Sequence, residues 1–152
     1  MKNFEGKTVL VTGGTKGIGK ACALEFSSRG AFVVMAYGRD PSAASSALEE
    51  LRGEGGEGIL LQSNLAEPDG ADRLWKSVCD AGQVPDILIL NGAYQEKVLA
   101  LDTDAELMQK TFQMNVFAGF LLAKACLKHW IEQGQKGVIV VHSSGQSTHV
   151  HQ

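Results

Sequence analysis

The sequence predicts an α/β fold with a doubly wound, parallel β-sheet. Short apolar runs alternate along the chain with amphipathic stretches, and each run is continuous rather than alternating between apolar and polar residues. Continuous runs are typical of strands buried on both faces of a parallel sheet, with helices as the crossover connections. The length of 152 residues and the hydrophobic content of 44% are those of one globular domain. The expected order is therefore βαβαβαβαβ.

Five runs rich in Val, Ile or Leu are the predicted strands. They cover residues 8–11, 31–36, 58–61, 86–90 and 137–141. The last run, with VIVV at 138–141, would be an edge strand that is apolar on both faces and has no later strand or helix to cover it. We therefore expect residues 1–152 to be the N-terminal part of a longer single-domain fold whose C-terminal strands and helices are missing, unless a second chain covers this edge.

Amphipathic stretches between the runs predict the first three helices. Asp40 is the expected N-cap of the second helix, with Pro41 at its first position, and Gly82 ends the third. Apolar residues recur at helical spacing in each helix: Ile18, Ala21, Cys22 and Phe26; Ala44, Ala47, Leu48 and Leu51; Ala71, Leu74, Trp75 and Val78. Each helix therefore has an apolar stripe available for packing.

The longest predicted helix covers residues 104–133. Thr103 and Glu106 form a capping-box pattern at its start. In its second half, from Val116 to Ile131, apolar residues surround the helix instead of forming one stripe, which indicates burial on most sides. One face can pack on the sheet, and the other needs a partner. Either later residues or a second copy of the chain could cover that face, and the second case would give a homo-oligomer that associates through this helix.

Composition and charge argue against several classes of protein. With 14 Lys and Arg against 17 Asp and Glu, the net charge is −3, and no basic cluster offers a surface for nucleic acid. The longest apolar stretch, residues 116–127, is interrupted by Lys124 and is too short to span a membrane. Three scattered cysteines are typical of reduced thiols, so a cytoplasmic location is expected. No metal site is expected, because His149 and His151 supply two ligands only.

A glycine-rich turn, TGGTKGIG at residues 12–19, separates the first predicted strand from the first helix. Glycines allow the backbone to approach a pyrophosphate, and the helix N-terminus offers free N–H groups, so this context predicts a nucleotide site in a Rossmann-type fold. A tight turn with a purely structural role is the simplest alternative. Residues 14–20 also fit the triphosphate-loop pattern G-x-x-x-x-G-K, but Ala21 stands where that loop needs a Ser or Thr for Mg²⁺.

Taken as T-G-x-x-x-G-x-G, the turn resembles the cofactor loop of the short-chain dehydrogenase/reductase family. Further motifs agree in their order along the chain: Asn64-Leu65 after the third run, Asn91-Gly92-Ala93 after the fourth, Asn115 in the long helix, and Ser143-Ser144-Gly145 after the fifth. The fourth-run motif departs from the family, because Leu90 replaces its first Asn and its Ala-Gly order is reversed. The resemblance implies cofactor contacts at Gly13, Thr15, Lys16, Gly17, Ile18, Gly19, Arg39, Asn64, Leu65, Asn91, Gly92 and Ala93, and catalytic roles for Ser144 and Asn115.

Each of these polar residues also has a structural interpretation. Asn64 can satisfy its own turn, Asn91 can cap a strand end, and Asn115 can be a hydrogen-bonded amide within a helix. Ser143 and Ser144 can be ordinary loop residues. It is the joint order of the motifs that favours the functional interpretation.

The end of the second predicted strand bears on the choice of cofactor. An acidic residue there would accept the ribose hydroxyls of NAD. By the family's pattern Tyr37 occupies this position, Arg39 follows it, and Lys16 precedes the second motif glycine. Two basic side chains favour the 2′-phosphate of NADP(H). NAD is the alternative, because both cations can be solvated surface charges and Asp40 can serve NAD if it does not cap a helix.

The resemblance implies an oxidoreductase that interconverts a ketone and a secondary alcohol by hydride transfer with NADP(H), similar to 3-oxoacyl carrier-protein reductases and acting on a small-molecule carbonyl or alcohol. Such enzymes use a Tyr as general acid/base and a Lys four residues later. Tyr37 and Tyr94, the only tyrosines, have no Lys at that spacing, so the pair is expected beyond Gln152. The alternatives are a catalytically inert nucleotide-binding or interaction module and, less favoured, a triphosphate-loop protein.

Overall fold

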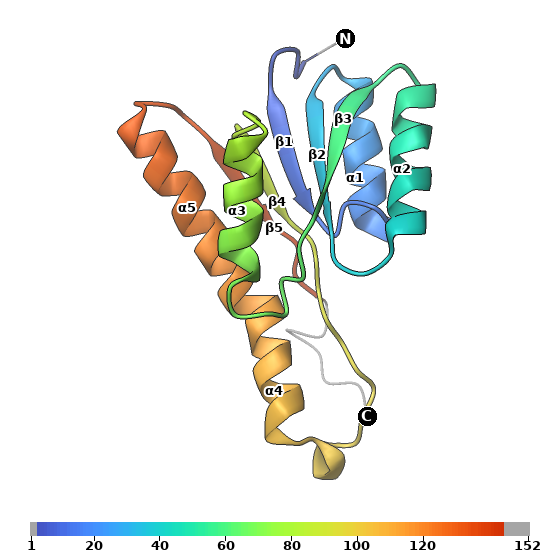
Figure 1. The fold of residues 1–152 in the computed structure, drawn as a ribbon, viewed down its shortest axis with the longest axis vertical. Helices are drawn as coiled ribbons and strands as arrows, with labels where there is room; N and C mark the ends of the chain where they lie inside the picture. Colours follow the sequence, from blue (N-terminus) through green and yellow to red (C-terminus); the bar gives the residue numbers. More distant parts are fainter. Residues whose placement is uncertain (1–2, 145–152) are drawn as a thin grey trace.

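The five predicted strands form one parallel sheet in the order β3-β2-β1-β4-β5 (Figure 1). They are β1 (Thr8–Thr12), β2 (Phe32–Tyr37), β3 (Glu57–Gln62), β4 (Ile87–Leu90) and β5 (Val138–Val141), each within one residue of its predicted bounds. The fold is that of a computed structural model, which describes residues 3–144. The strand order reverses between β1 and β4, as in a doubly wound, Rossmann-type sheet, so the predicted fold class is confirmed.

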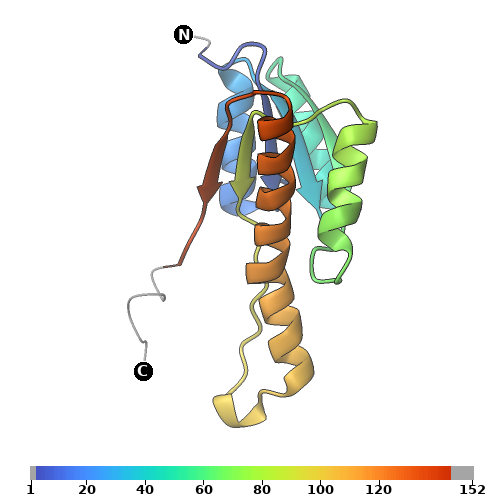
Figure 2. The same ribbon diagram turned by 90° about the vertical axis from the view of Figure 1, so that its left-hand side faces the viewer.

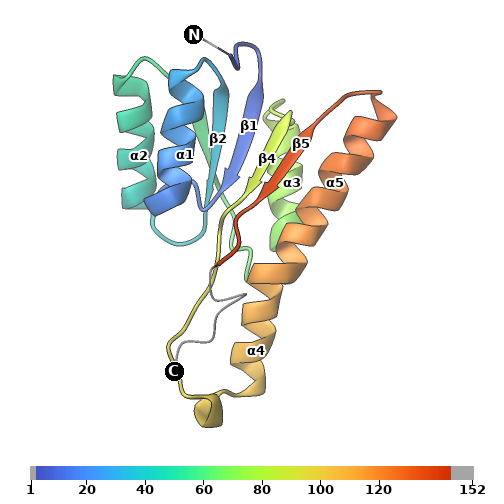
Figure 3. The same cartoon turned by 180° about the vertical axis from the view of Figure 1, so that it is seen from behind.

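Helices cover both faces of the sheet, which explains why its strands are apolar throughout. α1 (Gly17–Ser28) and α2 (Pro41–Gly53) lie on one face, and α3 (Gly70–Asp80) and α5 (Ala118–Glu132) lie on the other (Figures 1 and 3). Successive strand residues point to opposite faces. Leu10 therefore packs with α3 and α5, whereas its neighbours Val9 and Val11 pack with α1 and α2.

The face of α1 that meets the sheet differs from the apolar stripe in the sequence. Gly19 and Ser27 are buried there, whereas Ile18 is 70% exposed and lines an open groove with Phe4 and the rest of the stripe. Small residues are required on the buried face because the helix starts very close to the preceding turn. A Cβ on Gly19 would lie 2.2 Å from the carbonyl oxygen of Gly13.

The single helix predicted over residues 104–133 is interrupted. The chain forms α4 (Ala105–Phe112), then a π-helical turn, η2 (Gln113–Phe117), and then α5. A short 3-10 helix, η1 (Ala100–Asp102), precedes α4. The hydrophobic pattern of the sequence continues through α4, η2 and α5. It therefore gives no sign of the π-helical turn.

The N-terminus of α4 is capped by Asp104 rather than by the predicted Thr103–Glu106 box. The Asp104 carboxylate accepts the N–H of Leu107 at 2.8 Å, and the Thr103 hydroxyl donates to the Leu99 carbonyl instead. Leu107 is the third residue of α4, and its N–H is one that an Asp at the N-cap can reach. The predicted box is therefore wrong, because the helix begins one residue later than the box requires.

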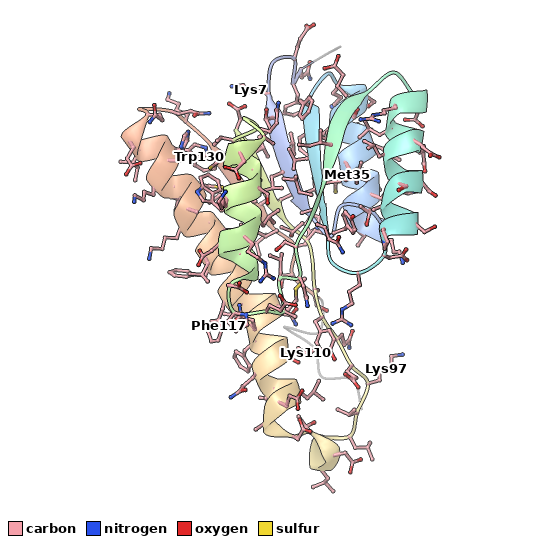
Figure 4. All side chains as sticks on the ribbon, in the orientation of Figure 1. Lys7, Met35, Lys97, Lys110, Phe117 and Trp130 are labelled. Carbon is pink, nitrogen blue, oxygen red and sulfur yellow. The ribbon has the colours of Figure 1, made fainter. Side chains whose placement is uncertain are left out.

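Apolar side chains remain exposed on two surfaces, the long helical region and the edge strand β5. The sequence predicts that both would be covered by other residues or by another chain. α4 extends beyond the carboxyl edge of the sheet (Figure 1), and Phe117, next to it, points away from the fold (Figure 4). β5 lies at the outer edge of the sheet (Figure 2), where Val138 and Val141 are 54% and 67% exposed. Within residues 3–144, no helix combines the length and hydropathy needed to cross a bilayer.

Asp86 ties β1, β4 and the α5–β5 connection together at the amino edge of the sheet. Its carboxylate accepts Lys7 Nζ at 2.8 Å, the N–H of Thr8 at 2.9 Å and Gln135 Nε2 at 3.2 Å. Burial raises the pKa of Asp86, but the hydrogen bonds from Lys7 and Thr8 outweigh it and hold the pKa below the ordinary value. The folded state therefore favours the ionised carboxylate.

Asp86→Asn is expected to lower the free energy of unfolding at pH 7 by about 1–3 kcal/mol, because an amide cannot accept all three donors. The carboxylate's contribution is fully present above its unfolded-state pKa and is lost as the pH falls through the lower folded-state pKa. Urea denaturation should therefore show a smaller difference between variant and wild type at about pH 3 than at pH 7. Asp80→Asn, at an exposed ion pair with Lys76, is the control and should change stability by less than about 1 kcal/mol.

Candidate cofactor-binding site

The loops that follow β1 and β4 meet at the carboxyl edge of the sheet, where the strand order reverses. Crevices at such a switch point are the usual ligand sites of doubly wound folds. The glycine turn after β1 lies directly against the loop after β4, since a Cβ added to Gly13 would lie 2.9 Å from the Cα of Gly92. Two cavities are lined by this contact.

The three glycines of the motif are required for different reasons. Gly13 and Gly17 have φ angles of 61° and 51°, in the left-handed region that favours glycine. Gly19 instead lacks space, because a Cβ there would lie 2.4 Å from Asn91 Nδ2 as well as against the Gly13 carbonyl. Contact with Asn91 therefore requires glycine at position 19 independently of any ligand.

Thr12 and Asn91 form the hydrogen bonds that hold this contact. The buried Thr12 hydroxyl accepts the backbone N–H groups of Asn91 and Gly92, each at 3.0 Å, and donates to the Ile89 carbonyl. The side-chain amide of Asn91 donates to the carbonyls of Thr12 and Gly13, at 3.1 and 3.3 Å. Asn91 therefore links β1 to β4 and also lines both cavities.

The N-terminus of α1 is open to an anion. In the described part of the chain α1 and α3 have no side-chain cap, whereas Asp40 caps α2 and Asp104 caps α4. Uncapped N–H groups and the positive end of the helix dipole suit a pyrophosphate. The turn and this helix end therefore fit the dinucleotide that the glycine motif implies.

The first cavity, of about 340 Å³, lies at the carboxyl ends of β1 to β4. It brings together seven of the predicted cofactor contacts: Gly13, Arg39, Asn64, Leu65, Asn91, Gly92 and Ala93. The other five belong to the turn and the start of α1 and line neither of the two cavities: Thr15, Lys16, Gly17, Ile18 and Gly19.

Asn64 lines the first cavity but bonds locally. Its Oδ1 accepts the N–H of Ala66 at 3.2 Å, and its Nδ2 donates to Glu67 at 3.0 Å. Asn64 thus satisfies its own turn, as its structural interpretation expects, and its contact with a cofactor stays a prediction. Leu65, beside it, is 7% exposed and packs in the core between α3 and the sheet.

Two basic side chains near the first cavity differ in their partners. Lys16 pairs with Asp40, with Nζ and Oδ2 2.5 Å apart, whereas the exposed Arg39 pairs with no other described residue. Asp40 also accepts the Ala43 N–H at 2.9 Å, as the predicted cap of α2. The hydrogen bonds from Ala43 and then Lys16 hold the pKa of Asp40 below its ordinary value. Lys16 thus has a carboxylate partner, and Arg39 is left as the nearby cation without one in the described chain.

The second cavity, of about 510 Å³, brings the predicted catalytic residues Asn115 and Ser144 together with His142 and Asn91. Asn115 lies in η2, where its Oδ1 accepts the Tyr94 N–H at 2.7 Å and its Nδ2 donates to the Tyr94 carbonyl at 2.8 Å. The interruption of the predicted helix thus lies where the Asn115 amide contacts the main chain of the β4–α4 loop. Gly145, His149 and His151 lie outside the described residues.

Lys20, the lysine of the triphosphate-loop pattern, pairs with Glu50 on α2 at 2.7 Å. Ala21 also replaces the Ser or Thr that would hold Mg²⁺. A triphosphate loop would therefore lack its metal ligand, and its lysine is already paired with a carboxylate. The geometry of the turn thus favours a dinucleotide over a triphosphate.

A family model for short chain dehydrogenase matches residues 7–151, which is nearly the whole sequence. The chain belongs to the short-chain dehydrogenase family. Among curated members of this family, the L-rhamnose 1-dehydrogenase (NAD(P)(+)) of Sphingomonas sp. (strain SKA58) is 33% identical over 145 residues, covering 95% of this chain and 57% of that protein. The 3-oxoacyl-[acyl-carrier-protein] reductase of Synechocystis sp. is 33% identical over 143 residues, covering 94% and 58%. The chain therefore spans less than three fifths of these relatives.

Solved structures of the family agree with the fold. A short-chain type dehydrogenase/reductase from Mycobacterium marinum superposes with a TM-score of 0.88 at 28% identity, covering 97% of this chain and 58% of that one. A short chain dehydrogenase from Burkholderia cenocepacia, in complex with NADP, gives a TM-score of 0.87 at 26% identity, covering 98% and 60%.

Three features of this family member were not identified from its sequence: the hydrogen bonds of Thr12, the bonds between Tyr94 and Asn115, and the position of His142 beside Asn91. The sequence does contain a signal for the contact between His142 and Asn91. His142 and Asn91 each follow directly after neighbouring parallel strands, and such strands end at the same edge of a sheet. The bonds of Asn115 had no such signal, because a π-helical turn cannot be identified from hydrophobic spacing.

Gly19→Ala in this family member is expected to lower the free energy of unfolding by about 2 kcal/mol or more, because the added Cβ must displace the Gly13 carbonyl or Asn91. Gly53→Ala in α2 is the matched control, since a Cβ there meets nothing within 4 Å. The control should keep or slightly raise stability. Urea denaturation of both variants measures the difference, and equal stabilities would contradict the close contact at Gly19.

Proposed function

We propose that the chain binds NADP(H) at the carboxyl edge of the sheet and serves hydride transfer between a ketone and a secondary alcohol. The observation that carries this proposal is the placement of the glycine turn and the uncapped α1 N-terminus beside a cavity lined by Arg39. The names of relatives support it, since one solved relative is described with NADP and one curated relative is named for NAD(P)(+).

A bound NADP(H) would supply or accept the hydride. The residues of this chain would orient the reactants: the turn and the α1 N-terminus hold the pyrophosphate, Arg39 holds the 2′-phosphate, and the Ser144 hydroxyl donates to the substrate oxygen in the second cavity. Asn115 has its amide bonded to Tyr94, so its role here is to fix the cavity wall.

Proton transfer needs a group that residues 1–152 do not supply at the family's spacing. The Tyr and Lys of the family are expected after Gln152, so the complete reaction is proposed for the whole protein. The substrate proposed is a small-molecule carbonyl or alcohol with an apolar body, because Leu90, Val116 and Phe120 line the second cavity.

Two substitutions are expected to change NADPH affinity in opposite directions. Arg39→Leu removes the cation open to the 2′-phosphate and should weaken NADPH binding about tenfold or more, with NADH binding nearly unchanged. Asp40→Asn removes the charged partner of Lys16 while keeping an N-cap for α2, because Asn caps helices as well as Asp does. It should strengthen NADPH binding. Fluorescence titration with NADPH and NADH measures both effects.

Arg29→Leu is the control for this pair of variants. Arg29 lies just past the C-terminus of α1 and pairs with Glu25, away from both cavities. Its loss should leave both affinities unchanged. An unchanged NADPH affinity in Arg39→Leu, or tighter binding of NADH than of NADPH by the wild type, would contradict the assignment.

A catalytically inert nucleotide-binding or interaction module is the second candidate. It is favoured by the lack of a Tyr-x-x-x-Lys motif within residues 1–152. NADPH binding by the chain, without turnover of any member of a carbonyl panel by the whole protein, would support this candidate over the oxidoreductase.

We also propose that the protein forms a homo-oligomer through α4 and α5. Exposed apolar side chains on these helices include Phe112 on α4 and Phe120, Leu127 and Ile131 on α5, and the last three line one groove. Ile131 is 78% exposed. An apolar surface of this kind is typical of an interface between subunits.

Phe120→Glu is expected to shift the protein from oligomer to monomer, because a carboxylate in an apolar interface is costly to desolvate. Ser46→Glu, on the exposed side of α2, adds the same charge elsewhere and should leave the assembly unchanged. Sedimentation velocity at several concentrations measures the mass. A Phe120→Glu variant that associates as the wild type does would argue against this interface.

A further inference from the structure

His142 follows β5 and lies beside the residue that holds the glycine turn. Its backbone N–H donates to the Leu90 carbonyl at 3.0 Å, which extends the β4–β5 pairing by one step. Its Nδ1 lies 2.9 Å from Oδ1 of Asn91. His142 also lines the second cavity, together with Ser144.

The partners of Asn91 determine which nitrogen of His142 carries the proton. The Nδ2 of Asn91 donates to two carbonyl oxygens, those of Thr12 and Gly13. Its Oδ1 is therefore the atom that faces His142, and this oxygen can only accept. The bond requires a proton on Nδ1, which leaves Nε2 of the neutral ring as an acceptor on the side away from Asn91.

We propose that His142 is a positioning residue for the nicotinamide cofactor. Its Nδ1–H fixes the Asn91 amide, and Asn91 in turn fixes the carbonyls of the glycine turn. This series of contacts joins the carboxyl ends of β5, β4 and β1, in that order, across the edge where the cofactor is proposed to lie. The inference rests on the proposed function, because the turn positions a cofactor only if NADP(H) binds there.

The position of the Asn91 amide matters because the surrounding space is small. Its Nδ2 lies 2.4 Å from where a Cβ on Gly19 would be, so the amide packs against the first turn of α1. A rotated amide would place Oδ1 against two carbonyl oxygens, which repel it. The carbonyls of the turn therefore set the amide orientation, and the His142 Nδ1–H adds a donor to the oxygen that this orientation presents.

Three variants of His142 separate this bond from the mere presence of a side chain. His142→Leu removes the donor. His142→Asn places an amide N–H near the position of Nδ1, whereas the longer side chain in His142→Gln places it near Nε2. His129→Leu is the control, because it removes an imidazole that lies in a groove between α3 and α5 and lines neither cavity of the site.

His142→Leu is expected to weaken NADPH binding to the chain about three- to tenfold, the range for loss of one hydrogen bond. His142→Asn should recover most of that affinity and His142→Gln should not, with melting temperatures recorded to compare the folding of all variants. Wild-type NADPH affinity in His142→Leu would overturn the proposal. Equal weakening in the Asn and Gln variants would overturn it as well.

The ¹⁵N spectrum of the neutral His142 ring, recorded without cofactor, is the second measurement. A proton on Nδ1 supports the bond to Asn91, and a proton on Nε2 overturns it. Because this spectrum needs no ligand, it separates the two proposals. If the wild type binds no NADPH, the proposed function fails and the role of His142 toward a cofactor fails with it, while a proton on Nδ1 would still establish the bond that holds the turn.

Discussion

The contact between the glycine turn and the loop after β4 is the constraint on which the site depends. Two parallel strands end side by side there, and their chains must separate while the backbone groups that leave the ladder still find partners. Thr12 and Asn91 supply those partners, and the glycines allow the approach. The same contact lies between the two cavities. In the proposed function the first cavity would receive part of the cofactor and the second would receive the substrate.

Most of the fold could be predicted from the sequence, because strands buried on both faces leave continuous apolar runs. The packing of α1 and the interruption of the long helix could not. Helical spacing shows which residues share a face, but not how close that face lies to the sheet, so Ile18 in the apolar stripe is exposed and Gly19 is buried. The π-helical turn lies where Asn115 bonds to a main chain 21 residues away, a contact that helical spacing does not reveal.

The candidate site was predictable as an ordered set of motifs but not as a set of interactions. The order of motifs identified Gly13, Asn91 and Asn115 at the carboxyl edge. It did not show that Asn91 and Asn115 bond to the main chain of this protein itself. Two cations were expected near the first cavity, and the pairing of Lys16 with Asp40, 24 residues away, leaves one of them open. Such pairings follow from the fold and cannot be counted from composition.

The edge strand β5 has a further consequence for the behaviour of the chain in solution. Its four residues, VIVV, are all β-branched, carry no charge, and pair in the described chain with β4 alone. An apolar, unpaired strand edge is a template for addition of another strand, and natural sheets usually protect it with charge, proline or cover. Of the two edge strands in the described sheet, β5 lacks the polar end residues that β3 has in Glu57 and Gln62, so it is the one more open to intermolecular β-pairing.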